Sequence, residues 1–272
     1  MARKQEGKKA FTLALINSKG GVAKTTTAVN LAAGLAGKTP RVLLVDLDAQ
    51  ASASMALNVP RAGLRPSAAD VLLEGMPIRQ ALRPTAVAGL DILPGSMELV
   101  NADLALADVR QRERRVQEAL APIAGDYAFV ILDCPPSLAL LPINALVAAD
   151  AFLVPVTPHY LALEGLVNLM DAVERMRQGI GTVAALLGIV LTMVDYRTKA
   201  TSEIAEVIRN HYSAQVLKTE IRMNIRLTEA PSFGQTIFDY DSRSTGADAY
   251  RRLAAEVLQR CRKMAGQKAL RH

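Results

Sequence analysis

The sequence predicts a three-layer α/β domain whose central sheet is twisted and mostly parallel. Short apolar runs along the chain are continuous rather than alternating, which is typical of strands buried on both faces. Helical patterns separate these runs, and strands joined through helices usually pair in parallel. No Pro/Gly-rich linker and no internal repeat divides the 272 residues, so we expect one domain.

The expected strands and helices alternate from one end of the chain to the other. Apolar runs rich in Val, Ile and Leu predict strands at residues 11–17, 41–47, 90–95, 127–133, 151–156 and 186–193. Helical patterns occupy residues 24–37, 97–120, 161–178 and 199–212, and a last helix at 245–264 should complete the fold.

Composition narrows the class of protein. Half of the residues are hydrophobic but only 4% are aromatic, so Ala, Leu and Val must form most of the core. No stretch approaches the ~18 apolar residues of a membrane span, and the N-terminus does not resemble a signal peptide. Two cysteines, Cys134 and Cys261, are too few for a disulfide framework. We expect a cytoplasmic protein with free thiols and no membrane partner.

The formal charge of +6 is unevenly distributed. Residues 1–10 carry +3 and residues 251–272 carry +6, which leaves −3 for residues 11–250. We expect a basic flexible arm at 1–10, one folded domain at 11–264 and a basic tail at 265–272. The basic ends either contact an anionic polymer or a membrane surface, or are simply solvated.

The stretch "NSKGGVAKTT", residues 17–26, lies between the first expected strand and the first expected helix. A phosphate-binding loop, G-x-x-x-x-G-K-[ST], occupies that position in P-loop proteins. Lys24 and Thr25 fill its lysine and threonine positions, whereas Ser18 and Ala23 stand at its two glycines. We expect Lys24 to reach the β- and γ-phosphates and the Thr25 hydroxyl to bind Mg²⁺.

Glycines at 20 and 21 lie inside this loop. They allow the backbone to approach phosphate oxygens, while successive N–H groups at a helix N-terminus form an anion cradle. Lys19 is a surplus charge for which a phosphate-binding loop acting alone has no evident use. The loop therefore reads as a nucleotide site of unusual design.

Aspartates end two of the expected buried strands. Asp46 and Asp48 follow "RVLLV", and Asp133 ends "YAFVILD". Ligands of open parallel sheets bind at the carboxyl ends of strands, where a carboxylate can hold Mg²⁺ through a water. Two strand-end aspartates that face a lysine-threonine loop are a more specific signal of a nucleotide site than any one of these features alone. The alternative is that Asp48 and Asp133 only cap helices.

The loop with Lys19 resembles the deviant Walker A motif, K-G-G-x-G-K-T-T, of the ParA/MinD ATPase family. The resemblance implies a P-loop NTPase fold, ATP and Mg²⁺ as cofactors, and slow hydrolysis to ADP and phosphate. It implies that Lys19 reaches the partner's nucleotide in a homodimer formed with ATP. Ala23 replaces the family's glycine. If that position needs a positive φ, its β-carbon costs about 1–2 kcal/mol.

The same resemblance assigns roles to individual residues. Asp48, in a variant of V-D-x-D-P-Q with Ala49 for proline, positions or activates the attacking water. Lys19, Lys24 and Asp48 are thus the expected catalytic residues, and Thr25 and Asp133 the expected magnesium site. The expected ATP-binding residues are Lys19, Gly20, Gly21, Val22, Ala23, Lys24, Thr25, Thr26, Arg222 and Asn224.

Segments far from the loop also resemble the family. "PVTPHYLALEGL" at 155–166 is similar to the segment after its second strand-end aspartate, and residues 221–250 are similar to its I-P-R-N-V-R-L-x-E-A-P-S segment. There the proline and asparagine face adenine. Asn224 matches the asparagine, whereas Arg222 replaces the proline, so only its backbone role can carry over. The pattern points to the ParA/Soj branch.

In that branch, arginines in segments similar to "VDYRTK" and "NIRL" contact DNA phosphates; here they correspond to Arg197 and Arg226. Arginine suits phosphate, and phosphate contacts carry no sequence information. The alternative is that both form surface salt bridges. Lys199, Lys218 and Arg243 are weaker candidates.

The resemblance implies an ATP-dependent switch that binds double-stranded DNA nonspecifically on the nucleoid. A ParB-like or analogous activator stimulates hydrolysis, and the switch positions a chromosome, plasmid or protein cluster. One alternative is a MinD-like membrane switch, but the C-terminal segment lacks bulky apolar anchors. Another is a non-hydrolysing binding module, for which Ala23 is the only support.

Overall fold

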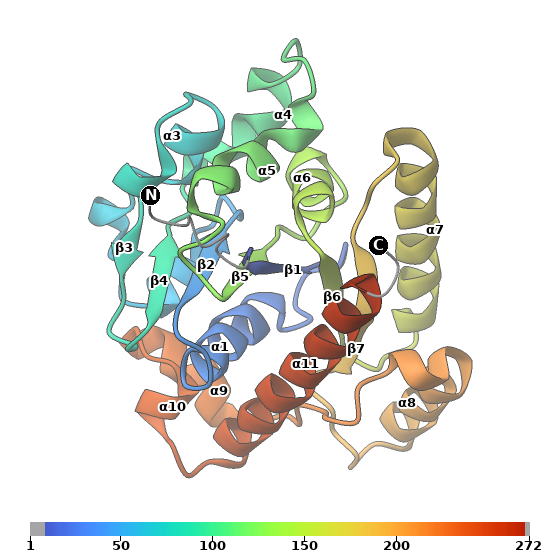
Figure 1. Ribbon diagram of the computed structural model, residues 1–272. Coiled ribbons are helices and arrows are strands. Elements are labelled where there is room, and N and C mark those ends of the chain that lie inside the picture. The colour runs from blue at the N-terminus through green and yellow to red at the C-terminus, as the bar shows by residue number, and fades with distance from the viewer. Residues whose placement is uncertain (1–8, 270–272) are drawn as a thin grey trace.

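In the computed structural model, which describes residues 9–269 and the side chains of residues 9–266, seven strands form one sheet (Figure 1). They are β1 (Phe11–Leu15), β2 (Val42–Asp46), β3 (Arg83–Pro84), β4 (Leu90–Leu93), β5 (Phe129–Asp133), β6 (Ala151–Val156) and β7 (Ala185–Leu191). Their order is β3-β4-β2-β5-β1-β6-β7. Every pairing is parallel except the edge pair of β3 with β4.

Helices lie on both faces of the sheet, as Figure 1 shows. They are α1 (Lys24–Ala36), α2 (Ser52–Ala56), α3 (Ala68–Leu72), α4 (Ala102–Ala105), α5 (Arg115–Leu120), α6 (Leu140–Ala148), α7 (Ala162–Ile180), α8 (Lys199–Tyr212), α9 (Ile225–Glu229), α10 (Ile237–Tyr240) and α11 (Thr245–Ala269). The predicted three-layer α/β fold with a mostly parallel sheet is confirmed.

Alternating residues of the central strand feed two separate cores. Leu13 and Leu15 of β1 pack in the core beneath α1 and α11, whereas Ala14 and the following Ile16 pack in the core beneath α6 and α7. All four side chains are inaccessible to solvent. Continuous apolar strands are therefore required here, because both faces of the sheet are covered.

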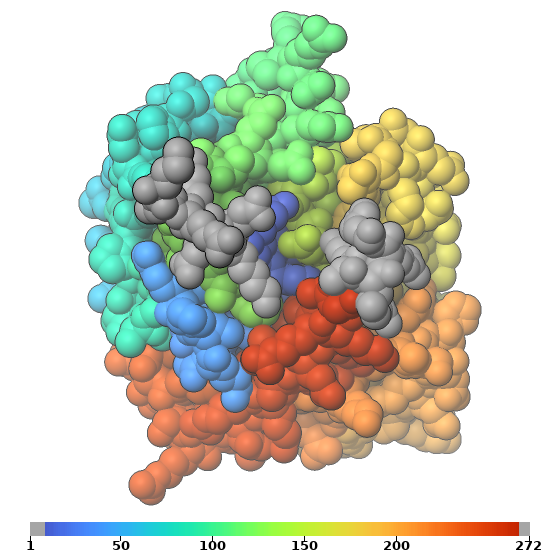
Figure 2. Space-filling view, in the orientation of Figure 1, coloured from blue at the N-terminus to red at the C-terminus, as the bar shows by residue number. Residues whose placement is uncertain are grey.

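The first and last helices lock the domain together. Gly34 of α1 lies so close to α11 that a β-carbon there would be 3.0 Å from that of Ala254. Tyr250 of α11 is fully buried, and its hydroxyl lies 3.2 Å from that of Thr27 in α1. Figure 2 shows α11, in red, against the blue segment that contains α1. This contact fixes the helix that follows the phosphate-binding loop.

The single helix predicted at 97–120 is wrong. A 3₁₀ turn at Met97–Asn101 leads into the short α4, and the chain then leaves helix until a second 3₁₀ turn at Arg112–Arg114 leads into α5. Between them, Gln111 has a φ of +57°. Residues 107–114 are mostly charged or polar and exposed, so no continuous apolar face holds this segment on the sheet.

Other boundaries also differ from expectation. Helix α6, which the pattern missed, carries Pro142 in its first turn, where a missing N–H costs no helical bond. Ala10 is buried and donates its N–H to the Ala124 carbonyl, and α11 continues to Ala269. The predicted flexible arm over residues 1–8, and residues 270–272 of the predicted tail, lie outside the described residues. Within residues 9–269, no helix is long and apolar enough to span a bilayer.

Candidate nucleotide site and candidate DNA-binding face

The carboxyl ends of β2, β5 and β1 meet at one edge of the sheet. The register pairs Asp46, the last residue of β2, with Asp133, the last of β5, and pairs Asp133 with Leu15 of β1. The loop of residues 17–23 leaves β1 at this edge and enters α1. The fold thus brings the loop and the strand-end aspartates together where open parallel sheets bind ligands.

The loop has the shape of an anion cradle. Lys24, the first residue of α1, is buried, and its Nζ lies 3.4 Å from the Asn17 carbonyl at the other end of the loop. No atom lies within 4 Å of a β-carbon built on Gly20 or Gly21, so the face of the loop at these glycines is open to a ligand. A lysine held among backbone N–H groups at a helix N-terminus suits a phosphate.

Ala23 adopts the positive φ whose cost was considered in the sequence analysis. Its φ is +55°, in the left-handed region, and it immediately precedes α1. An alanine costs about 1–2 kcal/mol there relative to glycine. Ala51, before α2, has the same conformation with a φ of +53°. Both turns at the site therefore carry a local strain that the surrounding contacts must offset.

Two polar residues that sequence reasoning missed hold the loop in place. The Asn17 amide donates to the Pro155 carbonyl of β6 at 2.8 Å and accepts the Lys19 N–H at 2.9 Å. The buried Thr192 hydroxyl, just after β7, donates to the Val22 carbonyl at 3.0 Å. The only signal in the sequence was a polar residue directly after each apolar strand, because buried polar groups need partners.

Asp133 is the unusual group of the site. It is fully buried, and neither carboxyl oxygen has a hydrogen-bond partner among the described residues. Burial, reinforced by the neighbouring Asp46 carboxylate, raises the pKa of Asp133 to about 8, while Thr25 and Lys24 oppose that shift. A buried carboxylate without partners is costly. A cation or metal-bound water would relieve that cost.

The donors around Asp133 fit magnesium, which prefers oxygen ligands and keeps several waters. Thr25 supplies a hydroxyl and Asp133 a carboxylate. No group of three His, Cys, Asp or Glu side chains in the described residues could hold a metal ion by itself. Magnesium would therefore depend on phosphate oxygens for the rest of its coordination. Thr25 lies near enough to Asp133 to oppose the rise of its pKa, and the role of the two residues as a magnesium site stays a prediction.

Asp46 and Asp48 differ in environment. Asp46 is fully buried and accepts bonds from the Ser54 N–H at 2.9 Å, the Ser54 hydroxyl at 2.7 Å and the Asp48 N–H at 3.2 Å. Burial raises the pKa of Asp46 to about 6, against these hydrogen bonds. Asp48 is half-buried and accepts the Gln50 N–H at 2.9 Å. Asp46 thus holds the turn through buried hydrogen bonds, whereas Asp48 is partly accessible to solvent.

Lys19 lies against its own chain. Its ammonium donates to the Leu161 carbonyl, just before α7, and its stem passes Gly165 so closely that a β-carbon there would be 2.7 Å from Cε. It is only half-buried. Among the described residues, the Lys19 side chain therefore has one backbone acceptor and no carboxylate partner. The predicted reach to a partner's nucleotide requires it to leave Leu161.

The predicted adenine-facing residues are held by neighbours within the chain. Asn224 caps α9, accepting the Arg226 N–H at 2.9 Å, and its amide donates to the Thr245 hydroxyl at 2.9 Å. The Arg222 guanidinium lies 3.1 Å from Glu220 and over the Tyr196 ring. The Arg222 side chain is thus directed at Glu220 and Tyr196, leaving its backbone as the part that matches the family role.

The two candidate DNA-binding arginines are exposed and paired with carboxylates. The Arg197 side chain is 84% exposed. Its Nε and Nη2 donate to the two carboxylate oxygens of Asp195 at 2.8 and 2.6 Å. Arg226 lies 2.9 Å from Glu229 and 3.6 Å from Asp241. The carboxylates accept these bonds at the surface, where ion pairs are weak. A phosphate could therefore compete for either guanidinium.

Comparisons with known proteins identify the family of the chain. The AAA domain model AAA_31 matches residues 10–184. The chromosome partitioning protein ParA of Myxococcus xanthus is 40% identical over 248 residues, covering 91% of this chain and 88% of that protein. The sporulation initiation inhibitor protein Soj of Bacillus subtilis is 41% identical over 245 residues, covering 90% and 97%.

Among solved structures, cobyrinic acid a,c-diamide synthase from Mycobacterium smegmatis, with a bound ATP analog and magnesium, superimposes with a TM-score of 0.80 at 33% identity. The match covers 92% of this chain and 95% of that one. Sequence relatives over nine tenths of the chain and a shared fold lead to one assignment. The chain belongs to the ParA/Soj family of P-loop ATPases.

Proposed function

We propose that this protein is an ATP-dependent switch that dimerises on binding ATP and Mg²⁺, binds DNA nonspecifically as a dimer, and is released when a partner stimulates hydrolysis. Such a cycle would position a chromosome, plasmid or protein cluster over the nucleoid. The observation that carries the proposal is the unpartnered, buried Asp133 beside the open loop of Lys24 and Thr25. That arrangement is incomplete without a cation and an anion.

The residues at this edge of the sheet have separate roles in ATP hydrolysis. Lys24 places its charge on the β- and γ-phosphates, and the loop N–H groups hold their oxygens. Thr25 and Asp133 would hold Mg²⁺, which neutralises charge that develops on the phosphates. Asp48, which is half-buried, orients the attacking water. Positioning of this kind supplies most of the catalysis in phosphoryl transfer.

Dimerisation would complete the site. In the part of the chain that the structure describes, the Lys19 ammonium has one acceptor, the Leu161 carbonyl, so it can leave that contact for a nucleotide across the interface at small cost. An ammonium gains more from a phosphate than from a neutral carbonyl. ATP would thereby couple the two subunits, and a dimer would present two copies of Arg197 and Arg226 to DNA.

An ATPase assay with and without duplex DNA tests the proposal. We expect slow basal turnover that requires Mg²⁺ and rises with DNA and further with an activating partner. Gel filtration with ATP should show a dimer, and with ADP a monomer. The switch would be contradicted if ATP turnover did not depend on dimerisation. It would also be contradicted if the protein failed to bind or respond to DNA in every nucleotide state.

A further inference from the structure

Ser54 links the aspartate-bearing end of β2 to the segment that follows β4, the neighbouring strand of the sheet. It is fully buried, and its hydroxyl donates to Asp46 at 2.7 Å while accepting the Gly95 N–H at 3.0 Å. Its own N–H also reaches Asp46. One hydroxyl therefore ties the end of β2 to the segment that follows β4.

Gly95 approaches the same turn at the limit of contact. A β-carbon at this position would lie 2.7 Å from the Asp48 carbonyl oxygen and 2.9 Å from Cγ of Asp46. Neither atom is the far end of a flexible chain, because Asp46 is fixed by Ser54 and the Asp48 carbonyl accepts the Ala51 N–H at 2.9 Å. Any side chain at residue 95 must displace the turn that carries Asp48.

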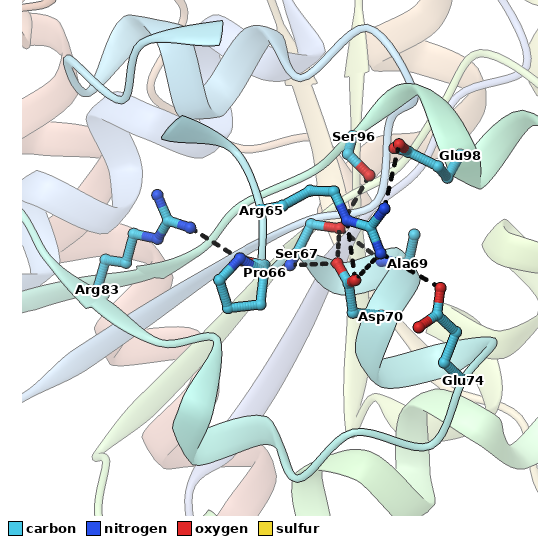
Figure 3. A network of polar contacts seen from close by, with 9 residues as sticks. All are labelled: Arg65, Pro66, Ser67, Ala69, Asp70, Glu74, Arg83, Ser96 and Glu98. Atoms are coloured by element: carbon cyan, nitrogen blue, oxygen red, sulfur yellow. Dashed lines mark hydrogen bonds and ion pairs between the residues drawn. The ribbon is translucent and has the colours of Figure 1, made fainter. Parts of the chain in front are cut away.

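Ser96, the residue after Gly95, belongs to a network of polar contacts (Figure 3). The buried Ser96 and Ser67 hydroxyls lie 2.8 Å apart, and Ser67 forms a capping box with Asp70 at the start of α3. Arg65 pairs with Asp70, and its guanidinium also reaches Glu98. Ser96, the residue after Gly95, is thus anchored through the buried Ser67 and Asp70. A larger residue at position 95 therefore cannot relieve its strain easily by moving this segment.

Asp48 depends on this support because its side chain has few contacts of its own. The carboxylate is half-buried and, within residues 9–266, accepts one hydrogen bond, from the Gln50 N–H in the same turn. The Asp48 N–H is tied to Asp46 at 3.2 Å. Its position relative to the loop is consequently set by the backbone of residues 46–51, which Ser54 and Gly95 hold.

We propose that Ser54 and Gly95 are positioning residues for ATP hydrolysis, forming a clamp that holds the Asp46–Asp48 turn so that Asp48 meets the attacking water. The inference rests on the proposed role of Asp48. It predicts that loosening or crowding the clamp lowers turnover and spares nucleotide binding, because Lys24 and the loop lie on β1 and α1. A displacement near 1 Å can cost about 10²-fold in rate.

The first test is Gly95→Ala, with Gly125→Ala as the matched control. Gly125 is exposed, and a β-carbon there meets no atom within 4 Å. We expect Gly95→Ala to lower kcat at least tenfold, with the Kd for a fluorescent ATP analogue within threefold of the parent. Gly125→Ala should leave both unchanged. An unchanged kcat in folded Gly95→Ala, or a Kd that weakens in proportion to kcat, would overturn the clamp.

The second test is Ser54→Ala beside Ser54→Thr, and it decides the question if Gly95→Ala does not fold. Removing the hydroxyl should lower kcat about tenfold, and threonine, which keeps it, should restore most of the loss. Equal kcat in the alanine variant and the parent would refute the proposal. Parallel assays of Asp48→Ala separate two failures: if that variant still hydrolyses ATP normally, the role of Asp48 itself is wrong.

Discussion

The nucleotide edge and the candidate DNA face use charge in opposite ways. At the edge, Lys24 and Asp133 are buried, and Asp133 has no partner among the described residues. On the face, Arg197 and Arg226 are exposed and already paired with carboxylates. Buried charges shift free energy strongly and depend on fixed geometry, whereas exposed pairs are weak and screened by salt. Substitutions at the edge should therefore cause large losses of ATP binding or turnover, whereas substitutions on the face should change DNA affinity only moderately.

The largest effect is expected for Lys24→Ala. It removes the buried ammonium that would meet the β- and γ-phosphates, so ATP binding should weaken by about 100-fold or more. Titration with a fluorescent ATP analogue measures it. Lys38→Ala is the control, because Lys38 is exposed at the far end of α1. Parental affinity in Lys24→Ala would mean that the loop does not hold the nucleotide.

Asp48→Ala should separate binding from chemistry. We expect turnover to fall toward background while ATP binding and ATP-dependent dimerisation persist, because affinity comes from the loop and Mg²⁺. Phosphate release and sedimentation measured on one preparation make the comparison. Hydrolysis at the parental rate would show that Asp48, like its neighbour Asp46, serves only the structure of the turn.

Lys19→Ala should act on assembly. In the monomer it loses one bond to the Leu161 carbonyl, so folding and ATP binding by one subunit should change little. In the dimer it would lose the contact with the partner's nucleotide. Sedimentation with ATP should therefore show a monomer where the parent shows a dimer. Normal dimerisation of this variant would refute the cross-subunit role.

The smallest effect is expected for Asp195→Asn, which frees Arg197 from its nearest carboxylate. DNA affinity should rise a few-fold, because phosphate no longer displaces an ion pair. The hydrogen bonds from Arg197 lower the pKa of Asp195 to about 2, so the pair is fully formed above the ordinary carboxyl pKa and is lost only as pH falls toward 2. Titration of Asp195 should consequently contribute no pH dependence to DNA binding between pH 6 and 8. Lower affinity in Asp195→Asn would mean that Asp195 orders Arg197 for DNA rather than competing with it.

Much of the edge could be predicted because its signals are local. A loop of fixed spacing after an apolar strand identified Lys24 and Thr25, and aspartates at strand ends identified Asp48 and Asp133. Ser54 and Gly95 could not be found this way, because they are 41 residues apart and only the pairing of β2 with β4 brings them together. Contacts between residues on different strands have no fixed separation in the sequence, so a single sequence does not reveal them.

The fold shows the same division. Buried strands were located within a few residues, since apolar runs bounded by polar residues are unambiguous when both faces are covered. The helix expected at 97–120 failed, because its charged second half matched a helical period without an apolar face to bury. On the candidate DNA face, the sequence offered surface salt bridges as the alternative for Arg197 and Arg226, but it did not identify Asp195 as the partner of Arg197, because that contact depends on a local turn.

The most direct test of the account is a salt titration of DNA binding with ATP, ADP and no nucleotide, on unrelated duplexes. Two arginines per subunit give four candidate phosphate contacts in a dimer, so these residues should contribute about −3.6 to the slope of log affinity against log salt. We predict tight binding only with ATP and equal affinity for all sequences. Changing both Arg197 and Arg226 to alanine should flatten the slope by about that amount while ATP-driven dimerisation survives. Binding that is independent of ATP, or an unchanged slope in the double variant, would contradict an ATP-gated DNA switch built on these arginines.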